Sequence, residues 1–263
     1  MGAALLAAVL TGLATVLGAV PFAFVRELPR RLYDGVLGLG AGLMLAAATL
    51  GLLGEALRDL RTDGELDLAR LLWVLLGFGA GVGLAAAMDR LIPHRHAGGH
   101  HQHLGHEPGH DVHDRDARRG YAVVGALTLH RIPEGLAIGA GFAMGGPSHL
   151  GLMLAIAVGL QNVCEGIVMA APLRQGGVSA VRGLVVVGLT GLATPAATLV
   201  GFGTAEIAVR TMPFILALAA GTLIYITSNE IIPESHSHGH EGTASTGVAL
   251  GFALMLVLRA VLP

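Results

Sequence analysis

Two segments of the sequence carry polar side chains one helical turn apart inside long apolar stretches. The segment Leu129-His130-Arg131-Ile132-Pro133-Glu134-Gly135 places His130 and Glu134 four residues apart. The segment Leu160-Gln161-Asn162-Val163-Cys164-Glu165-Gly166 does the same for Gln161 and Glu165. Residues four apart share one face of a helix. If the two helices face each other, one imidazole, two carboxylates and one amide converge.

This set of side chains suits a divalent transition metal. A mixed nitrogen and oxygen site fits Zn²⁺ and tolerates Fe²⁺, Mn²⁺, Co²⁺ or Cd²⁺. Carboxylates deep in apolar surroundings need a positive partner, and a dication that passes through supplies it. Pro133 cannot donate to the carbonyl of Leu129, so that oxygen can face a cavity or help to coordinate. The alternative is a polar clamp between helices without an ion, in which Arg131 is the positive group.

The elements that must position these residues are membrane-spanning helices. The chain has 263 residues, of which 53% are hydrophobic and 13% charged, and this is too apolar for an ordinary soluble domain. About 20 apolar residues cross a bilayer as a helix. The sequence therefore predicts an all-α polytopic membrane protein with eight spans: Ala3 to Phe24, Tyr33 to Leu57, Ala69 to Ile92, Tyr121 to Met144, Leu150 to Leu173, Val178 to Gly203, Met212 to Pro233, and Thr246 to Leu262.

The basic residues predict the orientation of these spans. With both termini outside the cytoplasm, ten arginines fall on the cytoplasmic side and five on the other, which agrees with the excess of positive charge found in cytoplasmic loops. The ten are Arg26, Arg30, Arg31, Arg90, Arg95, Arg115, Arg118, Arg119, Arg174 and Arg182. We expect a single transmembrane domain in the inner membrane, in contact with lipid.

A histidine-rich segment interrupts the hydrophobic pattern at residues 93–120, on the predicted cytoplasmic side. Imidazoles at such density bind zinc, copper or nickel loosely. A polar segment of this kind builds no core, and a solvated linker is the alternative interpretation. The histidines here are His94, His96, His100, His101, His103, His106, His110 and His113, and a second cluster of His236, His238 and His240 follows the seventh span.

Other function classes find little support in the sequence. A formal net charge of −2 without a basic arm argues against a nucleic-acid partner. A single cysteine, Cys164, excludes an intramolecular disulfide and a cysteine-based structural zinc site. The His-Glu-x-x-His motif of a zinc protease does not occur. We therefore expect no enzymatic activity and no cofactor, with the metal as substrate. A membrane metal sensor that uses the histidine-rich segment is the competing hypothesis.

The fourth and fifth predicted spans resemble the paired signature helices of the ZIP (Zrt/Irt-like) metal transporters, particularly the bacterial GufA-like branch. In that family these helices typically read His-Asn-Ile-Pro-Glu-Gly and Gln-Asn-Ile-Pro-Glu-Gly. Further similarity lies in Asp89-Arg90-Leu91-Ile92-Pro93-His94, in Ile224-Tyr225, and in Glu230-Ile231-Ile232-Pro233-Glu234-Ser235-His236. The resemblance extends over the whole chain in helix count and motif order.

The resemblance implies an eight-helix bundle that carries divalent cations into the cytoplasm, usually as a homodimer, by elevator-like rocking of the site helices against scaffold helices. It implies a primary metal site of His130, Glu134, Gln161 and Glu165. Asn162 and Arg131 match positions that line a second metal in members with two ions, and Glu230 matches a glutamate of the exit pathway.

Three positions depart from the family pattern. Arg131 replaces a usual Asn, Thr194 replaces a metal-bridging Glu before Pro195, and Cys164 replaces the proline of the second signature. With both glutamates ionised, Arg131 charged and His130 neutral, the local charge is −1, and a bound dication makes it +1. We therefore expect a single-ion site in which Arg131 takes the place of the second metal. A transporter with impaired transport is the alternative.

Overall fold

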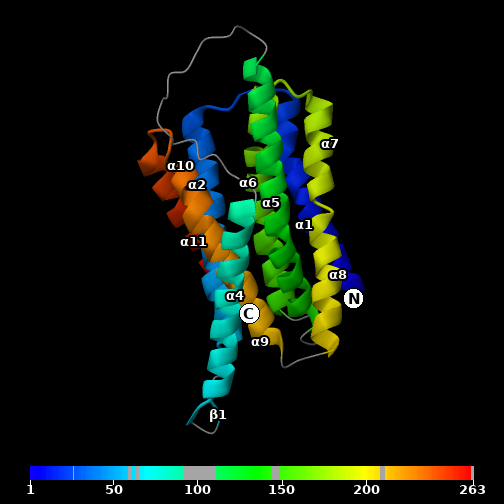
Figure 1. Ribbon diagram of the computed structural model, residues 1–263, viewed down its shortest axis with the longest axis vertical. Helices are drawn as coiled ribbons and strands as arrows, with labels where there is room; N and C mark the ends of the chain where they lie inside the picture. Colours follow the sequence, from blue (N-terminus) through cyan, green and yellow to red (C-terminus); the bar gives the residue numbers. More distant parts are fainter. Residues whose placement is uncertain are drawn as a thin grey trace.

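The protein is a bundle of long helices, seen in a computed structural model (Figure 1). The structure describes residues 1–25, 27–58, 61–62, 65–91, 111–143, 149–207 and 211–261. The long helices are α1 (Gly2–Ala19), α2 (Arg30–Ala46), α4 (Leu68–Leu91), α5 (Asp111–Ala143), α6 (His149–Gln175), α7 (Ala180–Thr190), α8 (Ala193–Ile207), α9 (Met212–Ile226) and α11 (Glu241–Val261).

Shorter elements extend or connect these helices. Helix α1 continues as η1 (Val20–Ala23), α2 as the π-helical η2 (Ala47–Leu53) and α3 (Gly54–Ala56), and α9 as the π-helical η4 (Thr227–Ile231) and α10 (Ile232–Ser235). A short hairpin of β1 (Arg61–Thr62) and β2 (Glu65–Leu66) lies at one end of the molecule.

Seven helical segments in the described part of the chain are long and apolar enough to cross a membrane. They start at Gly2, Arg30, Leu68, Leu150, Ala180, Met212 and Glu241, in agreement with seven of the eight predicted spans. The remaining predicted span lies within α5, which packs between α6 and α8 although polar residues reduce its hydropathy. The chain is thus an all-α, multi-pass membrane protein, with eight helical columns in the part that the structure describes.

Two boundaries differ from the sequence-based expectation. Helix α5 begins at Asp111, ten residues before the predicted span, because hydropathy does not detect a helix that continues into water. The predicted sixth span consists of two helices, since the chain turns at Gly191 and Leu192 between α7 and α8. This turn lies against α1, where a Cβ on Gly12 would collide with the carbonyl oxygen of Gly191.

The helices form two groups, each held by close backbone contacts at glycine. The site group contains α1, α5, α6, α7 and α8, and the second group contains α2, α4, α9 and α11 with their short extensions. A Cβ on Gly139 of α5 would collide with the backbone of α8, and one on Gly81 of α4 with the backbone of α9. Small residues allow such approach in membranes, where packing drives helix association.

Contacts between the two groups involve side chains. Helix α2 packs on α6, and α5 packs on α9. A Cβ on Gly40 of α2 would meet the Cβ of Cys164 at 3.3 Å, and one on Gly51 of η2 would meet the side chain of Leu154 at 3.4 Å. Wherever a Cβ on a described glycine would clash with the backbone of another helix, the two helices belong to the same group. The boundary between the groups is therefore looser than their interiors.

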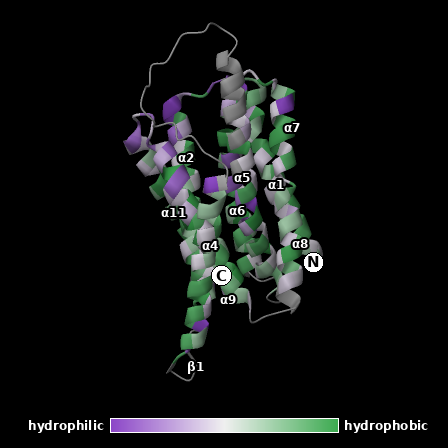
Figure 2. Cartoon of the chain, viewed as in Figure 1, coloured by the Kyte–Doolittle hydropathy of each residue, from purple (hydrophilic) through white to green (hydrophobic). Residues whose placement is uncertain are grey.

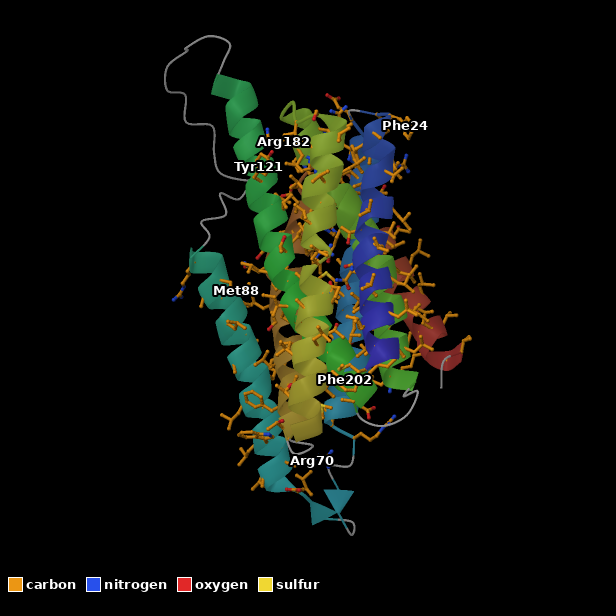
Figure 3. All side chains as sticks on the ribbon, turned by 90° about the vertical axis from the view of Figure 1, so that its right-hand side faces the viewer. Phe24, Arg70, Met88, Tyr121, Arg182 and Phe202 are labelled. Carbon is orange, nitrogen blue, oxygen red and sulfur yellow. The ribbon has the colours of Figure 1, made fainter. Side chains whose placement is uncertain are left out.

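Polarity is distributed along the bundle as a membrane protein requires. The helix bodies are mostly hydrophobic in Figure 2, and hydrophilic residues gather toward the upper end. Figure 3 labels Phe24, Tyr121 and Arg182 at that end and Arg70 at the other. The guanidinium of Arg182 lies 5.9 Å from the ring centroid of Tyr121, a cation–π contact between α7 and α5.

Candidate metal centre

Helices α5 and α6 carry the predicted site residues, and these side chains are buried. Exposed fractions are 3% for His130, 1% for Glu134, 1% for Gln161 and 5% for Glu165. Helix α5 continues through Pro133, so His130 and Glu134 remain on one face. The four predicted ligands therefore lie at the interface of two adjacent helices, away from the surface of the bundle.

Gln161 joins the two carboxylates. Its Nε2 donates a hydrogen bond to Oε1 of Glu165 at 3.0 Å and a second one to Oε1 of Glu134. Two acidic groups that accept from one nitrogen must point toward each other, so Glu134 of α5 and Glu165 of α6 converge. The structure thus brings three of the four predicted ligands into direct contact, with His130 one turn before Glu134 on α5.

Arg131 completes this cluster and is fully buried. Its Nη2 lies 3.1 Å from Oε2 of Glu165, and its Nη1 donates to Oγ1 of Thr15 on α1 at 2.7 Å. Removing one partner of such a buried ion pair typically costs about 3–5 kcal/mol, because the other charge is left without compensation. Separating Arg131 from Glu165 therefore requires another group to compensate each charge.

Helix α1 forms the third wall of the site. Asn162 of α6 donates from Nδ2 to the carbonyl oxygen of Thr11 at 2.8 Å, one turn from the contact between Thr15 and Arg131. Sequence reasoning missed Thr11 and Thr15. Their only signal was two hydroxyls four residues apart in an apolar span, a pattern that also occurs where threonine bonds its own helix, as Thr11 does to Ala8.

Several buried oxygens around the cluster have no hydrogen-bond partner among the residues that the structure describes. They are Oε2 of Glu134, Oδ1 of Asn162, and the hydroxyls of Thr194 and Thr198 on α8. One buried donor, Nε of Arg131, likewise has no partner among the described residues. Buried polar groups normally find partners, so water, an ion or a rearrangement of side chains has to satisfy these atoms. The backbone of α8 approaches α5 here, since the carbonyl oxygen of Thr194 would lie 2.6 Å from a Cβ on Gly135.

The carboxylates have other partners in this conformation. In the described part of the chain, no group of three or more His, Cys, Asp and Glu side chains forms a metal-binding cluster. Glu165 accepts from Arg131 and Gln161, and Glu134 accepts from Gln161. The observed arrangement is therefore a hydrogen-bonded cluster, and an ion that enters must exchange places with these donors.

Two further predicted residues occupy different surroundings. Cys164 is buried at the contact between α6 and Gly40 of α2. Glu230 lies in the π-helical turn η4 of the seventh predicted span. Such turns are rare and frequently occur at functional sites.

The histidine cluster after the seventh span binds an aspartate that sequence reasoning missed. His238 donates from Nδ1 to Oδ1 of Asp34 at 2.8 Å, and His240 donates from Nδ1 to Oδ2 at 3.1 Å. Asp34 is fully buried at the start of α2. His236 instead bonds the carbonyl oxygen of Ile232 and, through Nε2, the hydroxyl of Ser245. Two of the three imidazoles thus hold the connection before α11 against α2.

The other predicted loop ligands, His94, His96, His100, His101, His103 and His106, lie outside the described residues, as does His110. His113 falls within α5, so the predicted loop at 93–120 is helical from Asp111 onward.

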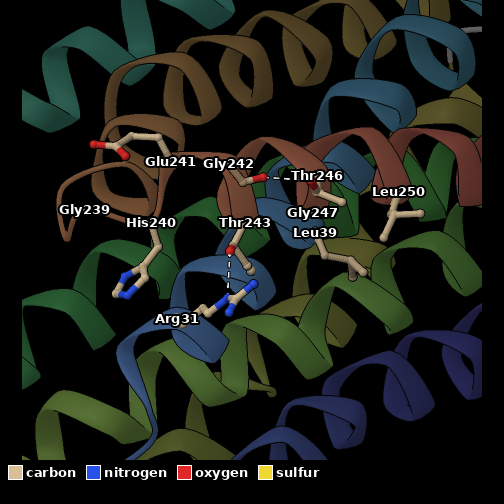
Figure 4. A pocket seen from close by; sticks show the side chains of 11 residues that line it. Arg31, Leu39, Gly239, His240, Glu241, Gly242, Thr243, Thr246, Gly247 and Leu250 are labelled. Carbon is tan, nitrogen blue, oxygen red and sulfur yellow. Dashed lines mark hydrogen bonds between the residues drawn. The ribbon is translucent and has the colours of Figure 1, made fainter.

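Two cavities lie at the end of the bundle that carries this histidine cluster. A groove of about 680 Å³ between α2 and α11 is lined by Arg31, His240 and Thr243, with a hydrogen bond of 3.2 Å from Nε of Arg31 to Oγ1 of Thr243 (Figure 4). A second cavity of about 300 Å³ lies between α2, α5, α6 and α10, and Gln175 and His238 are among its lining residues.

Comparison with known proteins identifies relatives over almost the whole chain. The family model described as ZIP Zinc transporter matches residues 92–259. The Zinc transporter GufA of Myxococcus xanthus is 38% identical over 98% of this chain and 98% of its own length. The Zinc transporter ZIPB of Bordetella bronchiseptica is 37% identical over 93% of this chain and 76% of its own length.

A more distant relative also matches over nearly the whole chain. The Zinc transporter ZupT of Corynebacterium aurimucosum is 31% identical over 94% of this chain and 92% of its own length. ZIP proteins are transporters, which agrees with the expectation of a protein without enzymatic activity. The matched length and the paired signature helices together establish that the chain belongs to the ZIP family, with GufA-like relatives.

Proposed function

We propose that this protein transports divalent transition-metal ions, zinc first among them, across the inner membrane into the cytoplasm. The observation that carries the proposal is the convergence of Glu134 and Glu165 on Gln161 inside a membrane-spanning bundle. Buried carboxylates on facing helices form a site that attracts a dication. The names of the similar proteins, all zinc transporters, support the same function.

His130, Glu134, Gln161 and Glu165 are the proposed ligands. Imidazole nitrogen and carboxylate and amide oxygen give a donor set that zinc accepts and that iron, manganese, cobalt or cadmium also tolerate. Gln161 would turn its carbonyl oxygen toward the ion, because its Nε2 cannot coordinate a cation. The primary site between α5 and α6 holds one ion, and Arg131 replaces a second metal where Thr194 offers no carboxylate.

The family resemblance implies transport into the cytoplasm, and we propose an orientation with both termini outside the cytoplasm. The cytoplasmic end then carries Arg30, Arg174 and Arg182, in accordance with the bias of positive charge. The 300 Å³ cavity lies at this end, and its residue Gln175 lies ten positions after Glu165, about 15 Å along α6. We propose this cavity as the cytoplasmic vestibule of the transport path. A homodimer stays a prediction of the family resemblance.

Zinc uptake into proteoliposomes tests this proposal. Glu134→Gln and Glu165→Gln remove one ligand charge each while they keep the side-chain volume, and we expect each to reduce uptake at least about tenfold, the factor that a loss of about 1.4 kcal/mol of binding gives. Glu55→Gln is the matched control, because Glu55 pairs with Arg58 outside the site. Uptake that is equal in all three variants would rule out transport through this site.

A metal sensor is the second candidate, in which the histidine-rich segment is the functional part. Deleting residues 96–110 removes six of the eight histidines of this segment and leaves α5, which begins at Asp111, intact. A transporter should retain zinc uptake after this deletion. A sensor should lose its metal response, and its full-length form should show no zinc flux.

A further inference from the structure

We propose that Arg131 is a tethered cation that competes with the transported metal for Glu165, pairing with this carboxylate when the site is empty and moving to oxygens of α6 and α8 when the ion arrives. This inference rests on the proposed function. It adds an exchange of partners that neither the ligand set nor the family membership implies.

Arg131 and Glu165 form a buried ion pair in the present conformation. Arg131 is 0% exposed and holds Oε2 of Glu165 at 3.1 Å. A metal that binds Glu165 has to displace this guanidinium or share the carboxylate with it. A dication and a guanidinium at the same carboxylate repel each other, so the two occupants exclude one another in part. Affinity for the ion is then reduced by the free energy of the ion pair that it breaks.

The displaced guanidinium moves toward the place where α5 meets the beginning of α8. Helices α5 and α8 advance in the same direction, because Gly139 meets Thr198 and Gly135 meets Thr194. One turn earlier on both helices, Arg131 lies level with Thr190 at the end of α7, next to the turn that precedes α8. The contact of Gly12 with Gly191 brings the turn that precedes α8 to α1, whose Thr15 already binds Arg131.

Acceptors without partners surround this junction. Oδ1 of Asn162 and the hydroxyl of Thr194 are buried and accept no hydrogen bond within the described part of the chain, and both residues are 0% exposed. A guanidinium has five N–H donors in a planar fork and no acceptor, so it suits a pair of neutral oxygens. The bond from Nη1 to Thr15 can act as the pivot, because it leaves Nη2 and Nε to change partners.

Arg131 also supplies a counter-charge when the carrier returns without an ion. After the ion leaves, two carboxylates in the bundle would otherwise have no counter-charge in a low-dielectric region, which is costly. Arg131 returns to Glu165 and leaves the cluster with a single negative charge. The residue is thus a positioning group that lowers the affinity for zinc and accelerates release and reset.

Equilibrium zinc binding and uptake kinetics of Arg131→Gln test the proposal. We expect the Kd and KM for zinc to fall about tenfold and kcat to fall as well, since release and reset lose their counter-ion. Arg131→Lys, which keeps the charge, should recover most of the wild-type affinity. Arg174→Gln is the matched control. Arg174 is a partly buried arginine of the same helix as Glu165, nine positions later, and it donates to the carbonyl oxygens of Phe22 and Val178, so zinc affinity should not change.

Thr194→Val keeps the test decisive if Arg131→Gln does not fold. Removing one acceptor for the displaced guanidinium should weaken zinc binding about threefold in the wild-type background. It should have no effect in the Arg131→Gln background, the coupling that a double-mutant cycle measures. Unchanged or weaker zinc binding in Arg131→Gln overturns the exchange, as does an unchanged affinity in Thr194→Val. If the wild-type protein neither binds nor transports zinc, the proposed function itself fails, which is a distinct result.

Discussion

Cys164 of α6 faces Gly40 of α2 across the boundary between the two helix groups, with 3.3 Å between the Cβ of the cysteine and the position that a Cβ on Gly40 would occupy. A disulfide needs Cβ atoms about 3.5–4.5 Å apart. A separation of a few tenths of an ångström between α2 and α6 therefore allows a bond between Cys164 and a cysteine introduced at position 40.

Gly40→Cys should accordingly form a disulfide with the single native cysteine under oxidising conditions. The bond ties the site-bearing group to the other group, so we expect oxidised protein to lose zinc uptake and a reductant to restore it. The measurement is uptake with and without reductant, together with labelling of free thiols. The control variant Gly40→Cys with Cys164→Ala should be insensitive to oxidation. Full transport by the cross-linked protein would show that the two groups do not move past each other.

Close packing within the site group predicts a contrast between two glycines. Gly139→Ala places a methyl group against the backbone of α8, and we expect destabilisation by about 1–3 kcal/mol, the usual cost of overpacking. Gly79→Ala on α4 meets nothing within 4 Å and should be neutral or slightly stabilising. Thermal unfolding in detergent compares the two variants. A lower melting temperature for Gly79→Ala than for Gly139→Ala would contradict the packing described here.

The buried Asp34 predicts a stability contribution at the end of the bundle that carries the histidine cluster. Asp34→Asn keeps the shape but removes the charge that accepts from His238 and His240, and we expect a loss of about 1–3 kcal/mol in the free energy of unfolding. Combined with His238→Gln, the effects should be less than additive, because both changes remove one bond. Additive effects in this double-mutant cycle would exclude direct coupling between the two side chains.

Metal stoichiometry tests the substitution of Arg131 for a second ion. Arg131→Asn removes the fixed cation, and Thr194→Glu supplies a carboxylate where family members have one. We expect the double variant to bind two zinc ions where the wild-type protein binds one. Calorimetry or metal analysis of the purified protein measures the ratio. A ratio that stays at one in the double variant would mean that Arg131 does not take the place of a metal.

The parts of the site that follow from local geometry could be predicted from the sequence. A separation of four residues fixes two side chains on one helical face, so the spacing alone pairs His130 with Glu134 and Gln161 with Glu165. Seven of the spans followed from hydropathy, which reports the length of apolar segments.

The remaining features depend on tertiary packing. The bond from Arg131 to Thr15 depends on which face of α1 meets α5, and no periodicity in an almost uniformly apolar helix specifies that face. The interruption between α7 and α8 was missed because Gly191 and Leu192 are as apolar as their neighbours. Asp34 sits at the start of a predicted span, where the hydropathy of the sequence does not indicate burial. Its full burial arises from a contact with residues more than 200 positions away.

The central claim is that one divalent ion binds between Glu134 and Glu165, and anomalous scattering at the zinc edge from crystals grown with zinc tests it most directly. The account predicts one strong peak within coordination distance of both carboxylates, with Arg131 moved away from Glu165. A peak confined to the histidine cluster at His236, His238 and His240, with the Arg131–Glu165 pair intact, would contradict it.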